Sequence, residues 1–331
     1  MTNCSSSPVP RIELPRTPLR VSALCLGCGP VGTVLLDEAL DRFVARFLAA
    51  GGNFFDTAHC YGFWQEGGNG ASERALGDCL RRLGALENVV IGTKGGHPAA
   101  PPAYPRPDGY LAPDVLRQDI ADSLERLRIP CIDLYWLHRD DPRVPVGEII
   151  ELLNEEITAG RLRALGGSNW STARLAAANV YAAAHGLQGF AASQPQWNLA
   201  VPNWQPTADP TMRFLQPADI RWHAATQTAV VAYSPTANGY FATNGQRGAE
   251  SFDNPTSRAR LQRATALAAD MGATTNQIAL AYLRSHPFPV VPILGTTDPV
   301  HLDDACGAVT LTLTADQVQW LENGDAVHSP A

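Results

Sequence analysis

The sequence lacks any apolar stretch long enough to cross a membrane, and its basic residues form no cluster longer than a pair such as Arg81-Arg82. A membrane helix needs about 20 consecutive apolar residues. Nucleic acids and anionic membranes attract clustered lysine and arginine, whereas this chain has a net charge of −7. Residues 1–8 also lack the basic region and apolar core of a signal peptide. We therefore expect a protein that binds neither nucleic acid nor membrane.

Cysteine is scarce and shows no pairing pattern. The seven cysteines, an odd number, are scattered through apolar segments, which is typical of reduced thiols in a cytoplasmic protein. Cys25 and Cys28 form one C-x-x-C pair, but a structural metal site needs four ligands and the sequence has no second pair. We expect a cytoplasmic location and no metal site.

No composition shift or flexible linker divides the 331 residues, of which 45% are hydrophobic. We expect one domain over residues 1–331, in which residues 1–20 form an N-terminal tail and hairpin. Apolar runs predict eight strands, at residues 21–27, 53–57, 89–93, 132–138, 162–166, 190–194, 228–233 and 290–294. Apolar residues at helical spacing predict helices at residues 36–51, 71–84, 113–128, 146–159, 172–185, 257–285, 300–305 and 315–322.

Eight apolar strands alternating with helices are typical of an α/β fold with a parallel sheet, and eight strands close a (β/α)8 TIM barrel. Three connections are longer than the fold requires, at residues 95–112, 198–227 and 234–256. All three follow the carboxyl ends of predicted strands. Because a TIM barrel holds its active site at that face, we expect these long loops to form the mouth of the site.

A second interpretation of the amino-terminal half is a Rossmann dinucleotide site. Residues 27–32 match G-x-G-x-x-G after a strand, and Asp56 follows at a suitable distance. However, Pro30 removes a backbone amide that a pyrophosphate would need, and no helix begins directly after the glycines. The repetition of eight similar units favours the barrel.

Four polar residues stand at or just beyond the carboxyl ends of predicted strands, namely Asp56, Tyr61, Lys94 and His138. In a barrel they converge on one face. We expect the Asp56 carboxylate to hold the Lys94 ammonium, and the ammonium to depress the pKa of the Tyr61 phenol from about 10. Tyr61 would then exchange a proton with substrate, and His138 would position a carbonyl oxygen.

Over about residues 20–322 the sequence resembles the aldo-keto reductase superfamily. The motifs that carry this resemblance are Asp56-Thr-Ala-His-Cys-Tyr61-Gly, Thr93-Lys94, Leu137-His138, Gly167-Ser-Asn169, Ser193-Gln-Pro-Gln-Trp-Asn198, Tyr233-Ser-Pro235 and the stretch from Pro292 to Asp304.

The resemblance implies a nicotinamide cofactor bound without a Rossmann fold, and hydride transfer between this cofactor and a carbonyl carbon. It implies that Tyr61 is the proton donor, tuned by Lys94 and Asp56, and that His138 orients the substrate. Trp197 would stack on the nicotinamide ring. The implied cofactor-binding residues are Gly29, Asp56, Ser168, Asn169, Gln194, Trp197, Tyr233, Ser234, Pro235, Gly295, Thr296, Thr297, His301 and Asp304.

Two departures from the family pattern refine the expected ligands. Members that use NADP generally carry Lys or Arg near Gly295, whereas this chain has Thr297 and Asp298, so we expect NAD(H) to be favoured over NADP(H). Arg247 and Arg258 are the alternative sources of the missing charge. Polar residues also follow His138, beginning with Arg139. We therefore expect Arg139 to contact a small polar carbonyl substrate, a sugar or polyol and not a steroid or long aldehyde. Trp64, Trp204 and Trp222 are candidate residues for stacking on sugar faces.

Three rival functions follow from the same residues. A metal-dependent barrel hydrolase would carry a His-x-His or similar cluster at its strand ends, which the sequence does not show. A Schiff-base lyase could use Lys94. A non-catalytic subunit could bind the cofactor and sense redox state, although the intact set of Asp56, Tyr61, Lys94 and His138 argues against it. The oligomeric state stays open.

Overall fold

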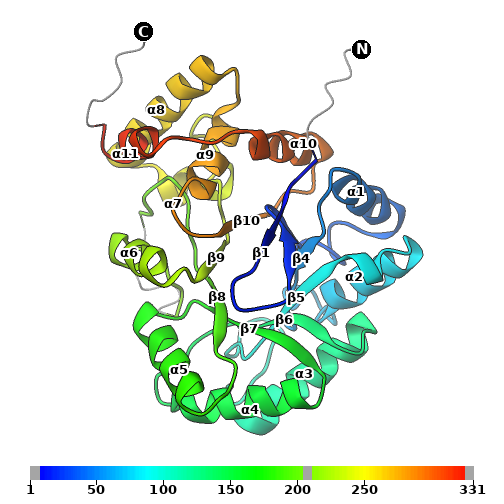
Figure 1. Cartoon of the computed structure of the whole chain (residues 1–331). Helices are drawn as coiled ribbons and strands as arrows, with labels where there is room; N and C mark the ends of the chain where they lie inside the picture. Colours follow the sequence, from blue (N-terminus) through cyan, green and yellow to red (C-terminus); the bar gives the residue numbers. More distant parts are fainter. Residues whose placement is uncertain (1–7, 204–210, 325–331) are drawn as a thin grey trace.

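Eight parallel strands close into a barrel in the computed structural model, which describes residues 8–203 and 211–324. The predicted (β/α)8 TIM barrel is confirmed, and Figure 1 shows its helices arranged around the strands. Each strand pairs in parallel with its neighbour in sequence, and the last strand closes the ring by pairing with the first. The barrel strands are β3 (Cys25–Gly27), β4 (Phe54–Asp56), β5 (Val90–Gly95), β6 (Ile132–Leu137), β7 (Leu162–Ser168), β8 (Phe190–Gln194), β9 (Ala229–Ala232) and β10 (Val290–Leu294).

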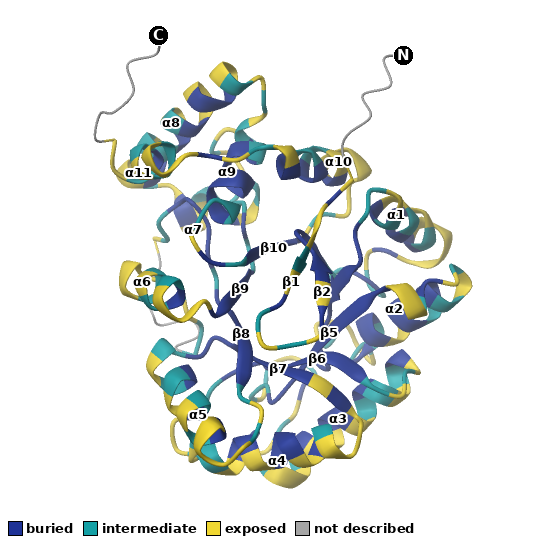
Figure 2. Cartoon of the chain, in the orientation of Figure 1, coloured by how far each residue is buried: buried dark blue, intermediate teal, exposed yellow. Residues whose placement is uncertain are grey.

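The helices bury one apolar face against the barrel and leave the other in solvent, as Figure 2 shows. In α1, for example, Leu40, Phe43, Val44 and Phe47 are buried at helical spacing. The helices are α1 (Asp37–Ala49), α2 (Ala71–Arg82), α3 (Pro113–Leu127), α4 (Val146–Thr158), α5 (Thr172–Ala184), α6 (Pro217–Thr226), α7 (Ala249–Phe252), α8 (Pro255–Met271), α9 (Thr275–Arg284), α10 (Pro299–Gly307) and α11 (Ala315–Asn323), with short 3-10 turns at Leu86–Asn88, Ala237–Gly239 and Ala308–Thr310.

Two segments differ in detail from the sequence-based expectation. The long helical region expected over residues 257–285 is divided into two helices, α8 and α9, because Gly272 adopts a left-handed conformation (φ 62°) that ends α8. The connection at residues 198–227 was expected to be a loop, but it contains α6. Gln216 caps α6 through a reciprocal pair of hydrogen bonds with Asp219, and Pro217 occupies its first turn.

A hairpin closes the amino-terminal end of the barrel. Its antiparallel strands are β1 (Arg11–Glu13) and β2 (Arg20–Ser22), and Figure 1 shows them lying across the barrel. Leu14, Leu19 and Val21 pack into the apolar cluster that fills the barrel interior. The Arg16 guanidinium donates to Thr228 Oγ1 at 3.1 Å, just before β9. The opposite end of the barrel, where the strands finish, therefore stays accessible.

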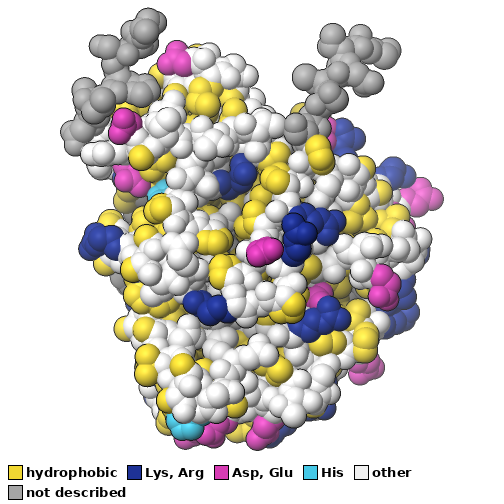
Figure 3. Space-filling view, in the orientation of Figure 1, with side chains coloured by type: hydrophobic (Ala, Val, Ile, Leu, Met, Phe, Trp, Pro, Cys, Tyr) yellow, Lys and Arg dark blue, Asp and Glu magenta, His cyan; other side chains and the backbone are white. Residues whose placement is uncertain are grey.

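The face that carries the hairpin shows acidic and basic side chains interspersed among apolar and neutral ones (Figure 3). Within residues 8–203 and 211–324, no helix combines the length and the apolar character needed to cross a membrane.

Candidate active site

A cavity of about 1680 Å³ is lined by residues at the carboxyl ends of the barrel strands and by all three long loops. His97 and Ala100 come from the first loop, Met212 from the second, and Arg247 from the third. The loops therefore contribute to the cavity as the sequence predicts. We call the part of the cavity lined by Tyr61 and His138 the deep end, because His138 is buried there. The part lined by residues of α10 is the outer end, where His301 is exposed.

Asp56, Lys94 and Tyr61 form a connected chain of polar groups at the deep end. Lys94 Nζ donates to Asp56 Oδ2 at 2.5 Å and to the carbonyl oxygen of Thr57 at 2.7 Å. It also lies 3.4 Å from the Tyr61 hydroxyl and 4.9 Å from the centre of the Tyr61 ring. Asp56 and Tyr61 line the cavity, whereas Lys94 lies behind them and is 1% exposed. The ammonium thus reaches the phenol from the barrel interior.

The loop that carries Tyr61 is held at several points. The backbone amides of Thr57 and His59 donate to carbonyl oxygens of β5 at 2.8 Å each, and Arg126 donates to the His59 carbonyl at 2.9 Å. Gly62 (φ 103°) ends the loop at a position where an added Cβ would lie 2.2 Å from the Gly68 carbonyl oxygen. These contacts fix the Tyr61 ring relative to β5 and Lys94.

The buried ion pair controls the charge of Lys94. Burial alone would lower the pKa of Lys94, but Asp56 and Tyr61 together raise it above its ordinary value. Burial raises the pKa of Asp56, and the Lys94 ammonium opposes that shift. Gln194 Nε2 donates to the second carboxylate oxygen, Asp56 Oδ1, at 2.9 Å. Lys94 is therefore an ammonium at neutral pH, and Asp56 is bonded on both of its oxygens.

The pKa of Tyr61 is shifted in the direction opposite to the sequence-based expectation. Burial raises the pKa of this phenol above its ordinary value of 10.0, and the lowering effect of Lys94 is smaller. The expectation was wrong because it counted the ammonium and omitted the loss of water around a buried phenolate. Tyr61 therefore keeps its proton at neutral pH.

The raised pKa of Tyr61 predicts how the rate depends on pH. If Tyr61 donates a proton to a carbonyl, kcat/KM for reduction should stay constant from about pH 6 to about pH 9 and fall only at higher pH. Alcohol oxidation, which needs the phenolate as base, should rise with pH over the same range. Initial rates in both directions measure this. A reduction profile that falls near pH 7 would instead mean that Lys94 depresses the phenol's pKa.

His138 follows β6 and faces Tyr61, with a distance of 5.9 Å between ring centres. Burial, and then the nearby His97 and Arg139, hold the pKa of His138 well below its ordinary value, so the imidazole is neutral. Cys60 Sγ lies 3.7 Å from His138 Nδ1. Burial raises the pKa of the Cys60 thiol to about 12, so the thiol keeps its proton, and we assign this thiol as the donor to Nδ1. We therefore assign the imidazole proton to Nε2.

Ser168, Asn169 and Gln194 lie beside Asp56 at the ends of β7 and β8. Ser168 Oγ donates to the Gln194 carbonyl at 3.0 Å. Asn169, which has a left-handed backbone (φ 60°), accepts from the Tyr233 hydroxyl at 2.8 Å and from the Arg213 amide at 3.0 Å. All three residues and Tyr233 line the cavity. They form a row of amide and hydroxyl groups next to the Asp56 carboxylate.

The outer end of the cavity is lined by predicted residues that follow β9 and β10 or lie on α10. Asp304 accepts hydrogen bonds from Thr274 Oγ1 at 2.8 Å and Asn276 Nδ2 at 2.7 Å, which ties α10 to the start of α9. Ser234 has a left-handed backbone (φ 50°). The sequence-predicted residues that line this end are Ser234, Pro235, Gly295, Thr296, Thr297, His301 and Asp304.

Besides Lys94 and Trp222, three predicted ligand-contacting residues of the described part of the chain do not line the cavity: Gly29, Trp64 and Trp197. Gly29 stands in the loop after β3, two residues past the lining residue Gly27, and Trp64 is 43% exposed beside Phe63. Trp197 is 2% exposed and packs against His286 and Phe288, with ring centres 4.7 and 6.0 Å away. Its indole packs among these rings and does not line the cavity, which disfavours the predicted stacking on a ligand there.

The remaining tryptophans do not supply a stacking surface in the described part of the chain. Trp222 lies on α6 and contacts His223, with ring centres 4.9 Å apart, and it does not line the cavity. Trp204 lies outside the described residues.

Several cavity residues were not singled out from the sequence. His97 follows β5, and its ring centre lies 4.6 Å from that of His138. Phe63 and Met212 also line the cavity. The long loop at residues 95–112 was expected at the mouth, and a histidine directly after the Lys94-Gly-Gly segment is the signal that could have identified His97.

Comparisons with known proteins agree with this geometry. The sequence model of the aldo/keto reductase family matches residues 23–325. The "Uncharacterized oxidoreductase YrpG" of Bacillus subtilis (strain 168) is 28% identical over 319 residues, which cover 94% of each chain. The "Aldo-keto reductase str7" of Strobilurus tenacellus is 27% identical over 305 residues, or 88% of this chain and 82% of that protein.

A solved structure shows the same fold. It is the thermostable aldo-keto reductase Tm1743, crystallised with the inhibitor epalrestat, and it superposes with a TM-score of 0.69 and 21% identity. The superposition covers 95% of this chain and 98% of that one.

Proposed function

Since this chain belongs to the aldo/keto reductase family and is an NAD(P)-dependent oxidoreductase, we propose that its substrate is the carbonyl or alcohol of a small polar molecule such as a sugar or polyol. The observation that carries the carbonyl chemistry is the joining of Asp56, Lys94 and Tyr61 in one hydrogen-bonded chain, with His138 facing the phenol in the same cavity. The polar substrate class rests on Arg139, which lines the same cavity.

The proposed roles follow from the protonation state of each residue. The nicotinamide cofactor, when bound, supplies or accepts the hydride. Tyr61 holds a proton at its hydroxyl and gives it to the carbonyl oxygen. Lys94 stabilises the phenolate that Tyr61 becomes, because its ammonium lies 3.4 Å from that oxygen. His138, with its proton assigned to Nε2, donates a hydrogen bond that orients the same carbonyl.

The donor groups of the cavity suit a nicotinamide dinucleotide. Ser168, Asn169 and Gln194 offer hydroxyl and amide groups that pair with a carboxamide. We propose that Tyr233, which lines the cavity beside them, provides the ring surface first assigned to Trp197. Ser234 would hold the pyrophosphate, and the residues near α10 the adenosine end, which fits a cavity of about 1680 Å³.

A substrate screen tests the proposal directly. The purified full chain is incubated with a panel of sugars, polyols and small aldehydes, with each nicotinamide cofactor in both directions, and nicotinamide absorbance is recorded. Turnover with polar carbonyl compounds or their alcohols supports the proposal. A protein that turns over only long apolar aldehydes would contradict the substrate class but not the oxidoreductase activity.

The Schiff-base alternative is disfavoured by the state of Lys94. A lysine that attacks a carbonyl must lose its proton, which requires a lowered pKa, whereas the pKa of Lys94 is raised. Because Lys94 is the only lysine in the chain, borohydride trapping with a carbonyl compound gives a clear test. A lyase would acquire a covalent label at Lys94, and the proposed oxidoreductase would not. Measurable turnover would likewise exclude a purely redox-sensing subunit.

Arg139 is proposed to contact the polar substrate. It lines the cavity next to His138, and its Nη1 donates to the His138 carbonyl at 2.9 Å. Arg139→Ala should raise KM for sugars at least about tenfold, a loss of about 1.4 kcal/mol in binding, and should raise KM less for small apolar aldehydes. Arg143→Ala is the matched control, because Arg143 pairs with Asp141 and Asp108 at 2.7 and 2.8 Å and does not line the cavity. Equal effects on both substrate classes would make Arg139 a structural residue.

We propose that NAD binds more tightly than NADP. Thr297 and Asp298 line the adenosine end, and an acidic side chain there repels the extra phosphate of NADP. Thr297→Arg combined with Asp298→Ser should shift the ratio of dissociation constants about tenfold toward NADP. Asp298 caps α10 by accepting from the Val300 amide at 2.8 Å, and serine preserves a cap. Quenching of tryptophan fluorescence by each cofactor measures both affinities.

If the unmodified protein already prefers NADP, Arg247 is the first residue to replace. Arg247 lines the cavity, whereas Arg258 does not and pairs with Asp253 at 2.7 Å. Arg247→Gln should then weaken NADP binding selectively, and Arg258→Gln serves as the matched control.

We also propose a cytoplasmic location. The support is that the six described cysteines are free thiols, as expected in a reducing compartment.

A further inference from the structure

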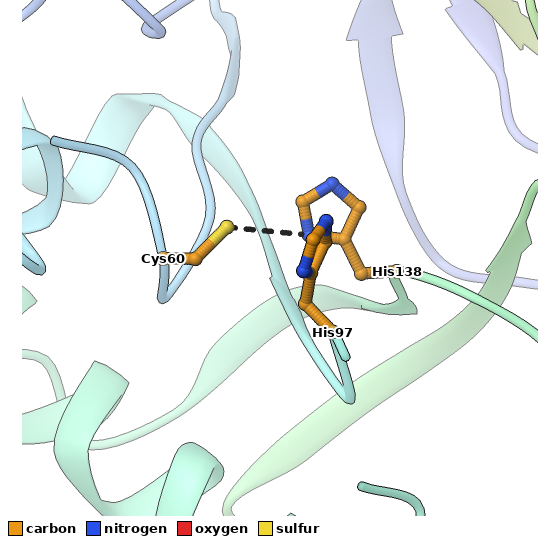
Figure 4. Close-up of side chains that lie close together, drawn as sticks. All are labelled: Cys60, His97 and His138. Atoms are coloured by element: carbon orange, nitrogen blue, oxygen red, sulfur yellow. Dashed lines mark hydrogen bonds between the residues drawn. The ribbon is translucent and has the colours of Figure 1, made fainter. Parts of the chain in front are cut away.

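Cys60, His97 and His138 lie together on one wall of the cavity, as Figure 4 shows. They come from three loops that follow β4, β5 and β6. One ligand atom of each residue, a thiol sulfur or an imidazole nitrogen, lies within 4.8 Å of the other two. The proposed reaction uses only His138, so the grouping of the other two beside it calls for a separate explanation.

We propose that Cys60, His97 and His138 form a binding site for a soft divalent cation such as Zn²⁺, and that an ion bound there inhibits the enzyme in competition with the carbonyl substrate. A cysteine thiolate and neutral imidazoles are the ligands that Zn²⁺ prefers. Three protein ligands leave one coordination position open, and here that position faces the cavity.

The distances are close to those of a tetrahedral zinc site. Zinc–sulfur and zinc–nitrogen bonds of about 2.3 and 2.05 Å at tetrahedral angles separate a sulfur from a nitrogen by about 3.6 Å. Cys60 Sγ and His138 Nδ1 are 3.7 Å apart. Since all three ligand atoms lie within 4.8 Å of one another, side-chain movements of about 1 Å would complete the geometry.

The hydrogen bonds around the site assign the protonated nitrogen of each histidine. His97 Nδ1 lies 2.7 Å from the Pro98 carbonyl oxygen, and because a carbonyl only accepts, Nδ1 carries the proton and Nε2 carries the lone pair. A backbone carbonyl on the second nitrogen is the usual support of a metal-binding histidine. The nitrogen of His138 that faces Cys60, Nδ1, is the one that now accepts the thiol proton.

Binding exchanges that proton for the metal. The Cys60 S–H bond breaks, a sulfur–zinc bond forms, and the proton leaves to water, with no change in oxidation state. The zinc-bound site carries one more positive charge than the same three residues without metal, because Zn²⁺ brings two charges and one proton leaves. His138 Nδ1 changes from an acceptor of the thiol hydrogen bond into a metal ligand.

The expected inhibition follows from the position of the ion. His138 and Tyr61 face each other across 5.9 Å between ring centres, and the carbonyl oxygen is proposed to lie between their polar atoms. An ion held by Cys60, His97 and His138 brings its fourth ligand, a water, into this space. The inhibition rests on the proposed function, whereas metal binding does not.

Calorimetric titration of the metal-free full chain with ZnCl₂ tests the binding. We expect one high-affinity ion that is lost with EDTA, and with Co²⁺ the appearance of a sulfur-to-cobalt absorption band. Cys60→Ser and His97→Gln should each weaken the dissociation constant about 100-fold or more, since even the loss of an outer partner costs 10- to 100-fold. Cys131→Ser and His185→Gln, which replace the same residue types outside the cavity, should bind as the unmodified chain does.

Unfolding temperatures measured without metal show whether each variant is folded. Unchanged affinity in folded Cys60→Ser and His97→Gln would overturn the site. In the activity assay, Zn²⁺ should raise the apparent KM for the carbonyl substrate and leave kcat unchanged, and the effect should be smaller in Cys60→Ser than in Cys131→Ser. Zinc that binds at this site and activates the enzyme, or that lowers only kcat, would overturn the competitive inhibition. A chain without activity toward any substrate would contradict the proposed function, and the titration would still test the metal site.

Discussion

Tyr61→Phe should lower kcat for carbonyl reduction by about 10²- to 10⁴-fold, the range expected for the loss of a positioned general acid. The variant keeps the aromatic ring, which packs near Trp64 and His138 with ring centres 6.2 and 5.9 Å away. It removes only the hydroxyl that lies 3.4 Å from Lys94 Nζ. The ring should therefore hold its place while the transferable proton is lost.

The effect should be confined to the chemical step. Cofactor affinity, measured by fluorescence quenching, should change by less than about tenfold, and the melting temperature should change little. Tyr181→Phe is the matched control, because it removes a phenol hydroxyl on α5 that bonds Glu151 and lies outside the cavity. It should retain full activity. Near-normal turnover by Tyr61→Phe would assign the proton donation to another group.

The sequence was sufficient to predict that Asp56, Tyr61, Lys94 and His138 lie together, because strand ends converge. In a closed parallel barrel all carboxyl ends meet at one face, so polar residues that end apolar runs must approach one another. Asp56 and Lys94 were predicted in this way, and they are bonded at 2.5 Å. The composition also draws attention to Lys94, because it is the only lysine of the chain. The structure buries this lysine fully.

The direction of the Tyr61 pKa shift was not predictable from the sequence. Residue types indicate that a phenol will lie near an ammonium, but they do not reveal how much water both groups lose. In the folded chain the cost of burying a phenolate exceeds the help from Lys94. This balance depends on side-chain packing across several strands, and strand-end positions do not encode it.

The stacking role predicted for Trp197 rests on a local motif, and the fold places its indole elsewhere. Trp197 and Tyr233 both follow adjacent strands, β8 and β9, but of the two only Tyr233 lines the cavity. Trp197 does not line the cavity and instead forms an aromatic cluster with His286 and Phe288, from the connection between α9 and β10. Partners more than 80 positions away in the chain thus decide which ring faces the cavity, and a local motif cannot show this.

The grouping of Cys60, His97 and His138 escaped sequence analysis for a third reason. Metal sites are usually recognised by short, regular spacing, and these residues come from three separate loops. Only the parallel register of β4, β5 and β6 brings them to one wall.

Breaking the pair of Asp56 and Lys94 should cost both stability and activity. Lys94→Met should lower the free energy of unfolding by about 3–5 kcal/mol, because it leaves a buried carboxylate without its counter-charge. It should also lower kcat by about 10²- to 10³-fold, because the Tyr61 phenolate loses its nearest positive charge. Urea unfolding and steady-state kinetics measure the two effects. Arg42→Met is the matched control, since Arg42 pairs with Glu38 at 3.2 Å and the two side chains are 72% and 88% exposed, so its loss should cost no more than about 1 kcal/mol.

The double variant Asp56→Asn with Lys94→Met separates stability from catalysis. Asparagine retains an oxygen that accepts the hydrogen bond from Gln194, which is 2.9 Å long in the unmodified chain. Because asparagine is neutral, it leaves no unpaired buried charge. The double variant should therefore recover part of the stability lost in Lys94→Met, because the penalty of an unpaired buried charge is removed. It should not recover kcat, since no ammonium approaches Tyr61. If stability stays at the level of the single variant, packing around the lysine side chain is what holds this region together. If activity returns, the ammonium has no part in the transfer of the Tyr61 proton.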